Sequence, residues 1–312
     1  MREAPLKLPE PLAYLNGRWL PLSQAAVSVF DGGFLQGTTV AEQLRTFRGQ
    51  LFRLDLHLSR LARSLEIVGV DPGLSLAELG QIAEELAEQN RKLIEADDDL
   101  GVTIFVTPGM SPTYAAVAKS QGPTVCVHTQ PLSFGTWAQK YETGESLVVT
   151  DVMQVPAQCW PAELKCRSRM HYYLADKRAR EIEAGARALL LDERGRVTEA
   201  STANIVLYFK DGGLVSPPIE HILPGVTMAV LEELSRQVGI PFGHRELTVA
   251  DVAGADEVLL CSTSPCIWSV TRLNGRPITD GKPGAMSRQL LDEWSRTVGL
   301  DIKAQAQRFA NR

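Results

Sequence analysis

Hydrophobic residues recur along this chain at two different periods. Over residues 54–68 they return every three or four positions, which is the period of an amphipathic helix, and Gly69 follows as a stop signal. A second helical pattern runs over about 75–96. Runs of apolar and β-branched residues at 101–107 and 123–129 then predict strands. This succession of elements predicts an α+β unit at the start of the chain.

The stretch ahead of these helices, 12–53, predicts strands joined by tight turns. Asn16-Gly17 separates the apolar runs of AYLNGRWL, and Arg48-Gly49 interrupts VAEQLRTFRGQLF. Asn-Gly is a strong hairpin signal, because both of its residues adopt positive φ at little cost. We therefore expect a hairpin at the first site and another turn at the second.

The second half of the chain is dominated by short strands, with helices expected at about 169–184, 225–238 and 284–297. Turns at 193–195 and 211–213 join neighbouring strands, which favours antiparallel pairing. No series of alternating strands and helices is visible, so a doubly wound sheet is not expected. The expected strands are 146–153, 186–192, 204–209, 213–218 and 257–263.

One stretch between the two halves has no hydrophobic period. It covers 131–144 (PLSFGTWAQKYETG) and contains proline and glycine, which are typical of connecting segments. The chain has 312 residues, which is more than one ordinary domain needs. We therefore expect a small N-terminal α+β domain over 1–130, an inter-domain linker over 131–144, and a large strand-rich domain over 145–312.

Composition narrows the classes of function. The net charge is −5 and the basic residues are scattered, so no nucleic-acid partner is expected. No apolar stretch is long enough to span a bilayer, and the N-terminus has no apolar segment typical of a secretory signal. The five cysteines form no CxxC pair, and their number is odd. These features favour a cytoplasmic protein with reduced thiols and no membrane partner.

Several common catalytic motifs are absent from the sequence. GxGxxG, GxSxG and HExxH do not occur. The nearest match to a phosphate-binding P-loop runs from Gly275 to Lys282. It has five residues between its glycines where four are needed, and Pro283 follows in place of Ser or Thr. The five histidines are dispersed, so no metal site is expected.

Two charged residues stand in segments that suit catalysis, and each is ambiguous when taken alone. Lys165, in the segment 163–168 (ELKCRS), precedes a predicted helix, but most lysines are simply exposed. Glu199 follows the run RVT in the segment 189–200, where it would also fit the solvated face of a hairpin. Lys165 and Glu199 become candidates for catalysis only in combination with other segments of the chain.

Two further segments suit the binding of an anion. The run LPGVT, 223–227, leads into an amphipathic helix, and a helix N-terminus can bind a phosphate or be an ordinary helix start. Small hydroxyl residues follow the predicted strand EVLLC, where they can line an anion site or form a plain turn. These hydroxyl residues are Ser262, Thr263 and Ser264.

In this order and at this spacing, the four segments resemble the fold-type-IV family of pyridoxal-phosphate enzymes. The family includes branched-chain aminotransferases, D-amino-acid aminotransferases and aminodeoxychorismate lyases. Two N-terminal segments extend the resemblance to about residues 14–300: 31–37 (DGGFLQG), with Glu42 following, looks like the family's DRGF-x-x-G, and 57–61 (HLSRL) looks like its H-x-x-R-L. The resemblance implies the two-domain α+β fold of the D-amino-acid aminotransferase type.

The resemblance also implies roles for individual residues. Lys165 would carry pyridoxal 5'-phosphate covalently and then move the substrate's α-proton as a general base. Glu199 would face the pyridine nitrogen and keep the ring protonated. Arg60, one helical turn from His57, would bind the phosphate. Further contacts to the phosphate are expected from Val226, Thr227, Ser262 and Thr263.

Several positions depart from the patterns of the family. Gly32 stands where the family commonly has arginine, and Ala41 stands where an aromatic residue is common. Met170 stands where branched-chain enzymes place a tyrosine. Thr113 and Ala115 stand where D-amino-acid enzymes carry an arginine and a histidine that bind the substrate carboxylate. The motifs therefore leave the choice between these two substrate classes open.

Three arginines and one turn are candidates for binding substrate carboxylates. Arg45 is the leading candidate for a second carboxylate, because it lies three residues after Glu42, where branched-chain enzymes also have an arginine. Arg167 and Arg169 lie beside the lysine, and Arg169 matches an arginine of the lyases. Backbone N–H groups of the Thr263–Ser264 turn would supply further donors. Each of the three arginines would fit a surface or structural ion pair equally well.

Together these features predict an aminotransferase that uses pyridoxal phosphate. It would move an amino group from an apolar, branched-chain-like amino acid to a 2-oxo acid such as 2-oxoglutarate by a ping-pong mechanism. A homodimer is expected, because this family builds its site at a dimer interface. The alternatives are an aminodeoxychorismate-type lyase, a D-amino-acid aminotransferase, and a catalytically silent binding protein on the same fold. The serine–threonine–serine turn favours transfer over elimination, and the presence of both Lys165 and Glu199 argues against silence.

Overall fold

The computed structural model describes residues 10–117 and 122–311, which form two compact units. The first unit consists of the chain up to Leu132 together with Lys165–Ser168, and the second consists of Ser133–Leu164 and the chain from Arg169 onward. Both units mix helices and strands, so the predicted α+β class is confirmed. Among the described residues, no helix combines the length and the apolar character that crossing a membrane requires.

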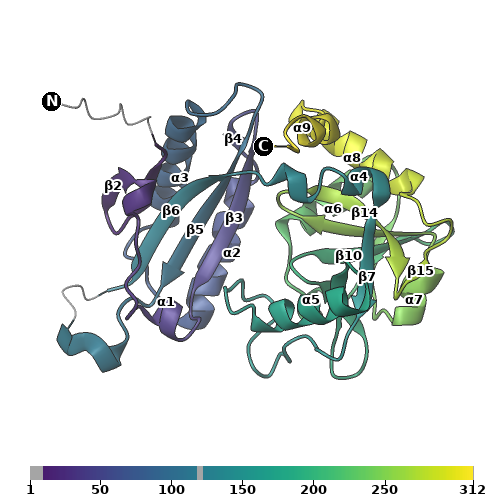
Figure 1. Cartoon of the computed structure of the whole chain (residues 1–312), viewed down its shortest axis with the longest axis horizontal. Helices are drawn as coiled ribbons and strands as arrows, with labels where there is room; N and C mark the ends of the chain where they lie inside the picture. The colour runs from purple at the N-terminus through teal and green to yellow at the C-terminus, as the bar shows by residue number, and fades with distance from the viewer. Residues whose placement is uncertain (1–9, 118–121, 312) are drawn as a thin grey trace. The chain divides into compact units, whose positions relative to one another are not determined.

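The first unit contains an antiparallel sheet in the order β2-β1-β6-β5-β3-β4 (Figure 1). Asn16 and Gly17 both have positive φ and connect the first two strands, which confirms the predicted hairpin. Arg48 and Gly49 make the other predicted turn in the same way. The strands are β1 (Leu12–Leu15), β2 (Arg18–Pro21), β3 (Val40–Phe47), β4 (Gln50–Leu51), β5 (Leu100–Thr107) and β6 (Thr124–Pro131).

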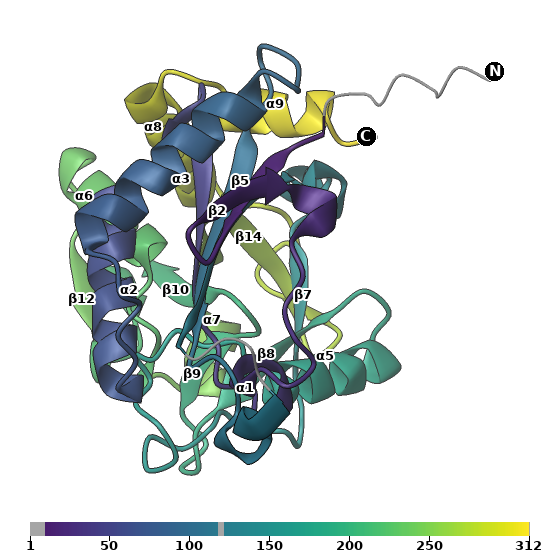
Figure 2. The same cartoon turned by 90° about the vertical axis from the view of Figure 1, so that its left-hand side faces the viewer.

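Two long helices pack against this sheet, as the hydrophobic periods predicted. Helix α2 (Leu54–Val68) ends at Gly69, whose φ of 65° is the left-handed conformation that glycine favours. Helix α3 (Leu76–Arg91) begins with a capping box formed by Ser75 and Glu78. Helix α2 contacts β3 and helix α3 contacts β6. The two helices also contact each other, and Figure 2 shows them next to one another. The unit also contains short helical turns: η1 (Leu22–Gln24), α1 (Gly32–Leu35) and η2 (Pro112–Val117).

A buried carboxylate joins α2 to β3. Glu42 on β3 is 0% exposed, and it accepts hydrogen bonds from Arg60 Nε (2.8 Å) and Arg60 Nη2 (2.9 Å). His57 Nδ1 lies 2.7 Å from the same carboxylate. Burial alone would raise the pKa of Glu42, but the Arg60 charge and the hydrogen bonds from both partners hold that pKa well below its usual range. The carboxylate therefore stays charged in the core.

The segment Lys165–Ser168 pairs with the first unit although it comes late in the chain. The amide of Ala41 donates to the carbonyl of Lys165 (3.1 Å), and the amide of Arg167 donates to the carbonyl of Thr39 (2.7 Å). Ser168 Oγ donates to the carbonyl of Gly37 (2.6 Å). Through these bonds the segment Lys165–Ser168 forms a short antiparallel ladder with the start of β3 and the residues just before it. The sequence places Lys165 in the domain 145–312, whereas its main-chain pairing groups it with the first unit.

The second unit contains a nine-stranded sheet among the described residues, in the order β12-β11-β10-β13-β14-β7-β8-β9, with β15 paired to β14 (Figure 1). The hairpins β8–β9 and β10–β11 are antiparallel, as predicted. The strands are β7 (Glu145–Val149), β8 (Arg187–Leu191), β9 (Val197–Ala200), β10 (Asn204–Phe209), β11 (Gly213–Ser216), β12 (Phe242–His244), β13 (Glu257–Ser262), β14 (Cys266–Leu273) and β15 (Arg276–Pro277).

The pairing of β7 with β8 is parallel, and helix α5 (Met170–Ile182) forms the crossover between them. A crossover of this length allows parallel strands to become neighbours. The sequence analysis predicted the helix but not the parallel pair. The other helical elements of this unit are η3 (Phe134–Thr136), α4 (Lys140–Thr143), η4 (Ile219–His221), α6 (Val226–Gln237), α7 (Val249–Gly254), α8 (Ala285–Val298) and α9 (Ile302–Arg308).

The stretch expected to be a linker, 131–144, is mostly packed into the second unit. Phe134, Trp137 and Tyr141 are buried there, and the ring of Phe134 stacks on that of Phe309 at 5.9 Å. The hydrophobic residues of this stretch show no regular period, because η3 and α4 are each about one turn long. Burial of three aromatic side chains nevertheless gives this stretch a fixed place.

We predict that Glu42→Gln lowers the free energy of unfolding by about 3–5 kcal/mol at neutral pH, because Arg60 is left buried without its counter-charge. Since the pKa of Glu42 lies below its ordinary value of 4.5, its contribution is present above that pH and is lost as the pH falls. The wild type should therefore lose more stability on acidification than the variant. Urea denaturation at several pH values measures both effects.

Glu66→Gln is the matched control for this experiment. Glu66 lies on α2, the helix that carries Arg60, and pairs with Arg63 at 2.7 Å. Both side chains are solvent-exposed, so the change should cost less than about 1 kcal/mol. Equal and small effects of the two substitutions would show that the Glu42 pair does not hold the helix to the sheet.

Candidate active site

The main chain of Lys165 is fixed on both sides. Its carbonyl accepts from Ala41 on β3, and its amide donates to Ser64 Oγ on α2 (3.2 Å). The positive charge of Lys165 is one of the influences that lower the pKa of His57, after burial as the main cause. The sequence-predicted lysine and the predicted pair His57 and Arg60 therefore lie in one region of the first unit.

Two of the candidate arginines of the first unit have side chains held by other residues. Arg60 is oriented by its two hydrogen bonds to Glu42. Arg45 is only 1% exposed, its Nε donates to the carbonyl of Thr46 (3.3 Å), and its guanidinium lies 4.0 Å from the centre of the Phe47 ring. Burial and stacking give Arg45 a well-defined place in the core of this unit.

Arg167 has a different environment, because its side chain is exposed and lines a hollow of about 310 Å³ in the first unit. His128 also faces this hollow, and burial together with the charge of Arg167 lowers its pKa, so that it is neutral at pH 7. The remaining lining residues are mostly threonines and aromatic or apolar residues: Val27, Asp31, Gly33, Phe34, Thr39, Thr103, Phe105 and Thr107.

In the second unit, Glu199 is the penultimate residue of strand β9 and is 5% exposed. Gln154 Nε2 donates to Glu199 Oε1 (2.6 Å), and the hydroxyl of Tyr172 on α5 donates to the same oxygen. Burial raises the pKa of Tyr172 well above 10, and the charge of Glu199 adds to this, so Tyr172 remains a protonated donor. The alternative prediction of a solvated Glu199 is therefore wrong.

Arg169 immediately precedes α5, next to these residues, and its side chain makes no capping hydrogen bond. Burial and the charge of Arg169 lower the pKa of His171 to about 4, so His171 is neutral at pH 7. The rings of His171 and Tyr172 lie 4.0 Å apart. Sequence reasoning singled out Arg169 but missed Tyr172 and Gln154, because their partner Glu199 lies 27 and 45 residues away.

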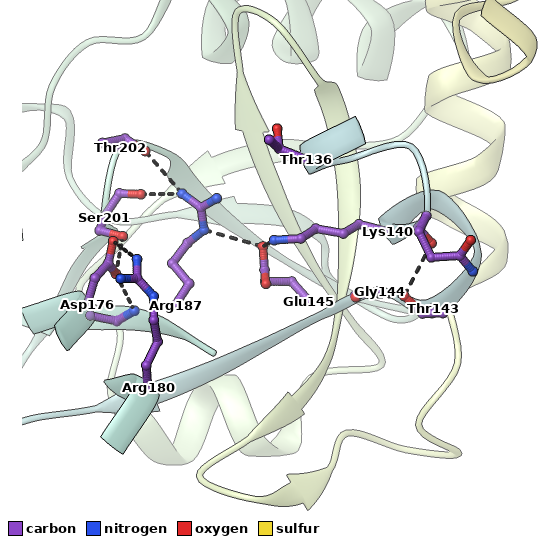
Figure 3. A network of polar contacts seen from close by, with 12 residues as sticks. Thr136, Lys140, Thr143, Gly144, Glu145, Asp176, Arg180, Arg187, Ser201 and Thr202 are labelled. Atoms are coloured by element: carbon purple, nitrogen blue, oxygen red, sulfur yellow. Dashed lines mark hydrogen bonds and ion pairs between the residues drawn. The ribbon is translucent and has the colours of Figure 1, made fainter. Parts of the chain in front are cut away.

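The turn that follows Glu199 is held from two sides (Figure 3). Ser201 Oγ donates to Asp176 Oδ1 on α5 (2.6 Å). Arg187 Nη1 donates to the carbonyl of Ser201 (2.5 Å) and to Thr202 Oγ1 (3.0 Å). Thr202 has a φ of 63°, an uncommon conformation for a threonine, which these contacts help to maintain.

Arg187 is itself anchored by a buried acid. Glu145 Oε2 lies 3.3 Å from Arg187 Nε and accepts a hydrogen bond from Lys140 Nζ at 2.5 Å (Figure 3). Two cations therefore neutralise one buried carboxylate at the start of β7. The chain of contacts runs from α4 through β7 and β8 to the turn after Glu199.

The start of α6 forms a cradle with the start of β10. Asn204 Nδ2 donates to the carbonyl of Leu223 (2.9 Å), and a Cβ atom on Gly225 would lie only 2.1 Å from Asn204 Oδ1. Glycine is therefore required for this close approach. Val226 and Thr227 follow in the first turn of this 12-residue helix, where backbone N–H groups and the helix dipole favour an anion.

The predicted turn of hydroxyl residues lies at the same end of the strands, beside the start of β10. Asn204 at the start of β10 pairs with Cys261 at the end of β13, just before Ser262, Thr263 and Ser264. Tyr141 from α4 donates to the carbonyl of Pro265 (2.6 Å), which fixes the far side of the turn. The second unit thus brings the residues predicted to bind a phosphate, 226–227 and 262–263, around one strand end, together with Ser264, which was predicted to bind the substrate.

Comparisons with known proteins identify the family of this chain. Residues 39–273 match the model of the amino-transferase class IV family. A D-alanine aminotransferase of Staphylococcus aureus (strain MSSA476) is 30% identical over 295 residues, which cover 91% of this chain and 97% of that protein.

Solved structures show the same fold. A branched-chain amino acid aminotransferase of Escherichia coli matches with a TM-score of 0.83 at 21% identity, covering 94% of this chain and 95% of that one. A branched-chain aminotransferase from the archaeon Thermoproteus uzoniensis, solved with norvaline, matches with a TM-score of 0.79 at 23% identity, covering 96% and 97%. The match of the family model over most of the chain is decisive, and this chain belongs to the class IV aminotransferases.

Proposed function

We propose that this enzyme uses pyridoxal 5'-phosphate to move an amino group from an amino acid to a 2-oxo acid, with donor and acceptor binding in turn at one site. The observation that carries the proposal is the cradle of Asn204 and Gly225 at the start of α6. It admits no side chain at Gly225 and leaves the amides of Val226 and Thr227 at a helix N-terminus. That donor set suits a phosphate group.

In this proposal each candidate residue has one role. Lys165 would hold the cofactor covalently and then accept and return the substrate's α-proton at Nζ. Arg60, Val226 and Thr227, with Ser262 and Thr263, would bind the phosphate. Glu199 would hold the proton of the ring nitrogen. The bound cofactor supplies an electron sink for negative charge at the α-carbon.

We propose an apolar, branched-chain-like amino acid as donor and an acidic 2-oxo acid as acceptor. Thr113 and Ala115 lack the charge that the D-amino-acid pattern requires, and this favours the branched-chain class. The relatives named D-alanine aminotransferase support D-alanine as the second candidate donor. A lyase reaction remains the third candidate. We also propose a homodimer, as the resemblance to this family implies, and a cytoplasmic location, which the unpaired pattern of the cysteines favours.

The half-reaction tests this proposal. Single amino acids should convert purified protein loaded with pyridoxal phosphate to its pyridoxamine 5'-phosphate form. The conversion is followed by absorbance, and 2-oxoglutarate should reverse it. Lys165→Ala should abolish the conversion, because it removes the amine that moves the α-proton. Conversion by D-alanine alone would overturn the proposed donor class, and release of pyruvate without amino transfer would identify a lyase.

A second prediction separates the candidate arginines. Arg167 lines an open hollow, whereas Arg45 is buried under Phe47, and we therefore favour Arg167 as the partner of the acceptor's distal carboxylate. Arg167→Gln should raise KM for 2-oxoglutarate by about tenfold or more, because a charged hydrogen bond is lost. KM for pyruvate, which has no distal carboxylate, should change little.

Arg45→Gln is the matched comparison, because sequence analysis alone favoured this residue. Its loss should lower stability more than it alters the ratio of the two KM values, since the side chain is packed in the core. A selective rise in KM for 2-oxoglutarate in this variant, with none in Arg167→Gln, would transfer the role to Arg45.

A further inference from the structure

Three side chains from separate elements of the second unit meet at one carboxylate oxygen. Gln154 comes from the loop after β7, Tyr172 comes from α5, and Glu199 comes from β9. Gln154 and Tyr172 both donate to Glu199 Oε1. Two donors on one oxygen of a carboxylate stabilise its negative charge, because charge-assisted hydrogen bonds are stronger than neutral ones.

The direction of both hydrogen bonds is determined by the surroundings. Gln154 Oε1 accepts from the backbone amide of Val155 (2.9 Å), so the amide nitrogen of the Gln154 side chain must face Glu199. The backbone amide of Gln154 also donates to the carbonyl of Leu191 (2.9 Å), which ties the loop to β8. Tyr172 keeps its proton, because burial and the neighbouring carboxylate raise its pKa. Both groups therefore act as donors toward Glu199.

Helix α5 also fixes the position of the carboxylate. Tyr172 and Asp176 are four residues apart and therefore lie on one face of the helix. Tyr172 holds the side chain of Glu199. Asp176 accepts from Ser201 in the turn that follows Glu199 (Figure 3). Asp176 also accepts from the amide of Ala188 (3.0 Å). One face of α5 thus holds both the side chain of Glu199 and the turn that follows it.

We propose that Tyr172 and Gln154 are positioning residues that keep Glu199 anionic, so that the shared proton stays on the nitrogen of the cofactor ring. This inference rests on the proposed function. A carboxylate that accepts two hydrogen bonds is a weaker base than one without donors. Without these donors the proton would move from the ring nitrogen to Glu199, leaving a neutral carboxyl group and a neutral ring, which is a poorer electron sink.

The position of the proton can be observed directly in the holoenzyme. Pyridoxal phosphate labelled with 15N in the ring is bound to the protein, and the 15N chemical shift distinguishes a protonated ring from a neutral one. Wild type should show the protonated ring. Tyr172→Phe and Gln154→Met, which remove one donor each at similar volume, should shift the signal toward the neutral ring, and the double variant should shift it further.

Catalysis provides a second readout. The rate of α-proton transfer should fall about tenfold for each donor removed, in line with the loss of a hydrogen bond to a charged group, while KM changes little. Glu199→Gln serves as the reference for a ring without its carboxylate. Tyr173→Phe is the matched control, because Tyr173 is the next residue on α5 and is 65% exposed, and it should alter neither the shift nor the rate.

Two results would overturn the inference in different ways. A protonated ring in Tyr172→Phe, Gln154→Met and the double variant would show that the two residues have only a structural role, whatever happens to the rate. A wild-type protein that binds no labelled cofactor would overturn the proposed function and this inference together. If one variant fails to fold, the other single variant still decides, because each removes a donor independently.

Discussion

The charge of Glu42 has to be neutralised inside the first unit, and much of that unit follows from this constraint. The strand β3 places the carboxylate on the face that α2 covers, where Arg60 and His57 are its partners. Those two residues lie three apart on α2, so the helix can dock in one register only. The same register brings Ser64 to the amide of Lys165. The buried ion pair thus helps to fix the main-chain position of Lys165, the proposed catalytic lysine.

The second unit solves the same physical problem with a second carboxylate. Glu199 is buried at the end of β9, and Tyr172 and Gln154 stabilise it with neutral donors. An arginine in their place would neutralise the acid fully. Neutral donors leave the negative charge in place, so that it can stabilise a cation such as a protonated ring. Behind them, Arg187 and Glu145 fix the turn, which prevents the carboxylate from relaxing toward solvent.

The sequence predicts the elements of this fold well where they are long and periodic. The helices over 54–68 and 226–237 lie where their apolar spacing placed them, because such faces must be buried locally. The parallel pairing of β7 with β8 was not predicted, since it depends on a crossover that no local pattern records. The ladder of Lys165–Ser168 against β3 was missed for the same reason, because its partners lie far earlier in the chain, as with Ser168 and Gly37 at 131 residues apart.

The candidate site could be predicted only in part. Motif order singled out Lys165, Glu199 and the helix start at Val226 as candidates, because the proposed chemistry requires those residue types. Tyr172 and Gln154 had no such signal, since a tyrosine on a helix and a glutamine in a loop are ordinary residues until the fold brings them to one oxygen. Positioning contacts of this kind depend on tertiary structure and cannot be found from local spacing.

Reductive trapping tests whether Lys165 carries the cofactor. Borohydride treatment of the holoenzyme, followed by proteolysis and mass spectrometry, should find the phosphopyridoxyl group on the peptide that contains Lys165. The yellow colour that bound pyridoxal phosphate gives the holoenzyme should disappear at the same time. Stable labelling of a peptide that contains any other lysine, with none on Lys165, would contradict the account.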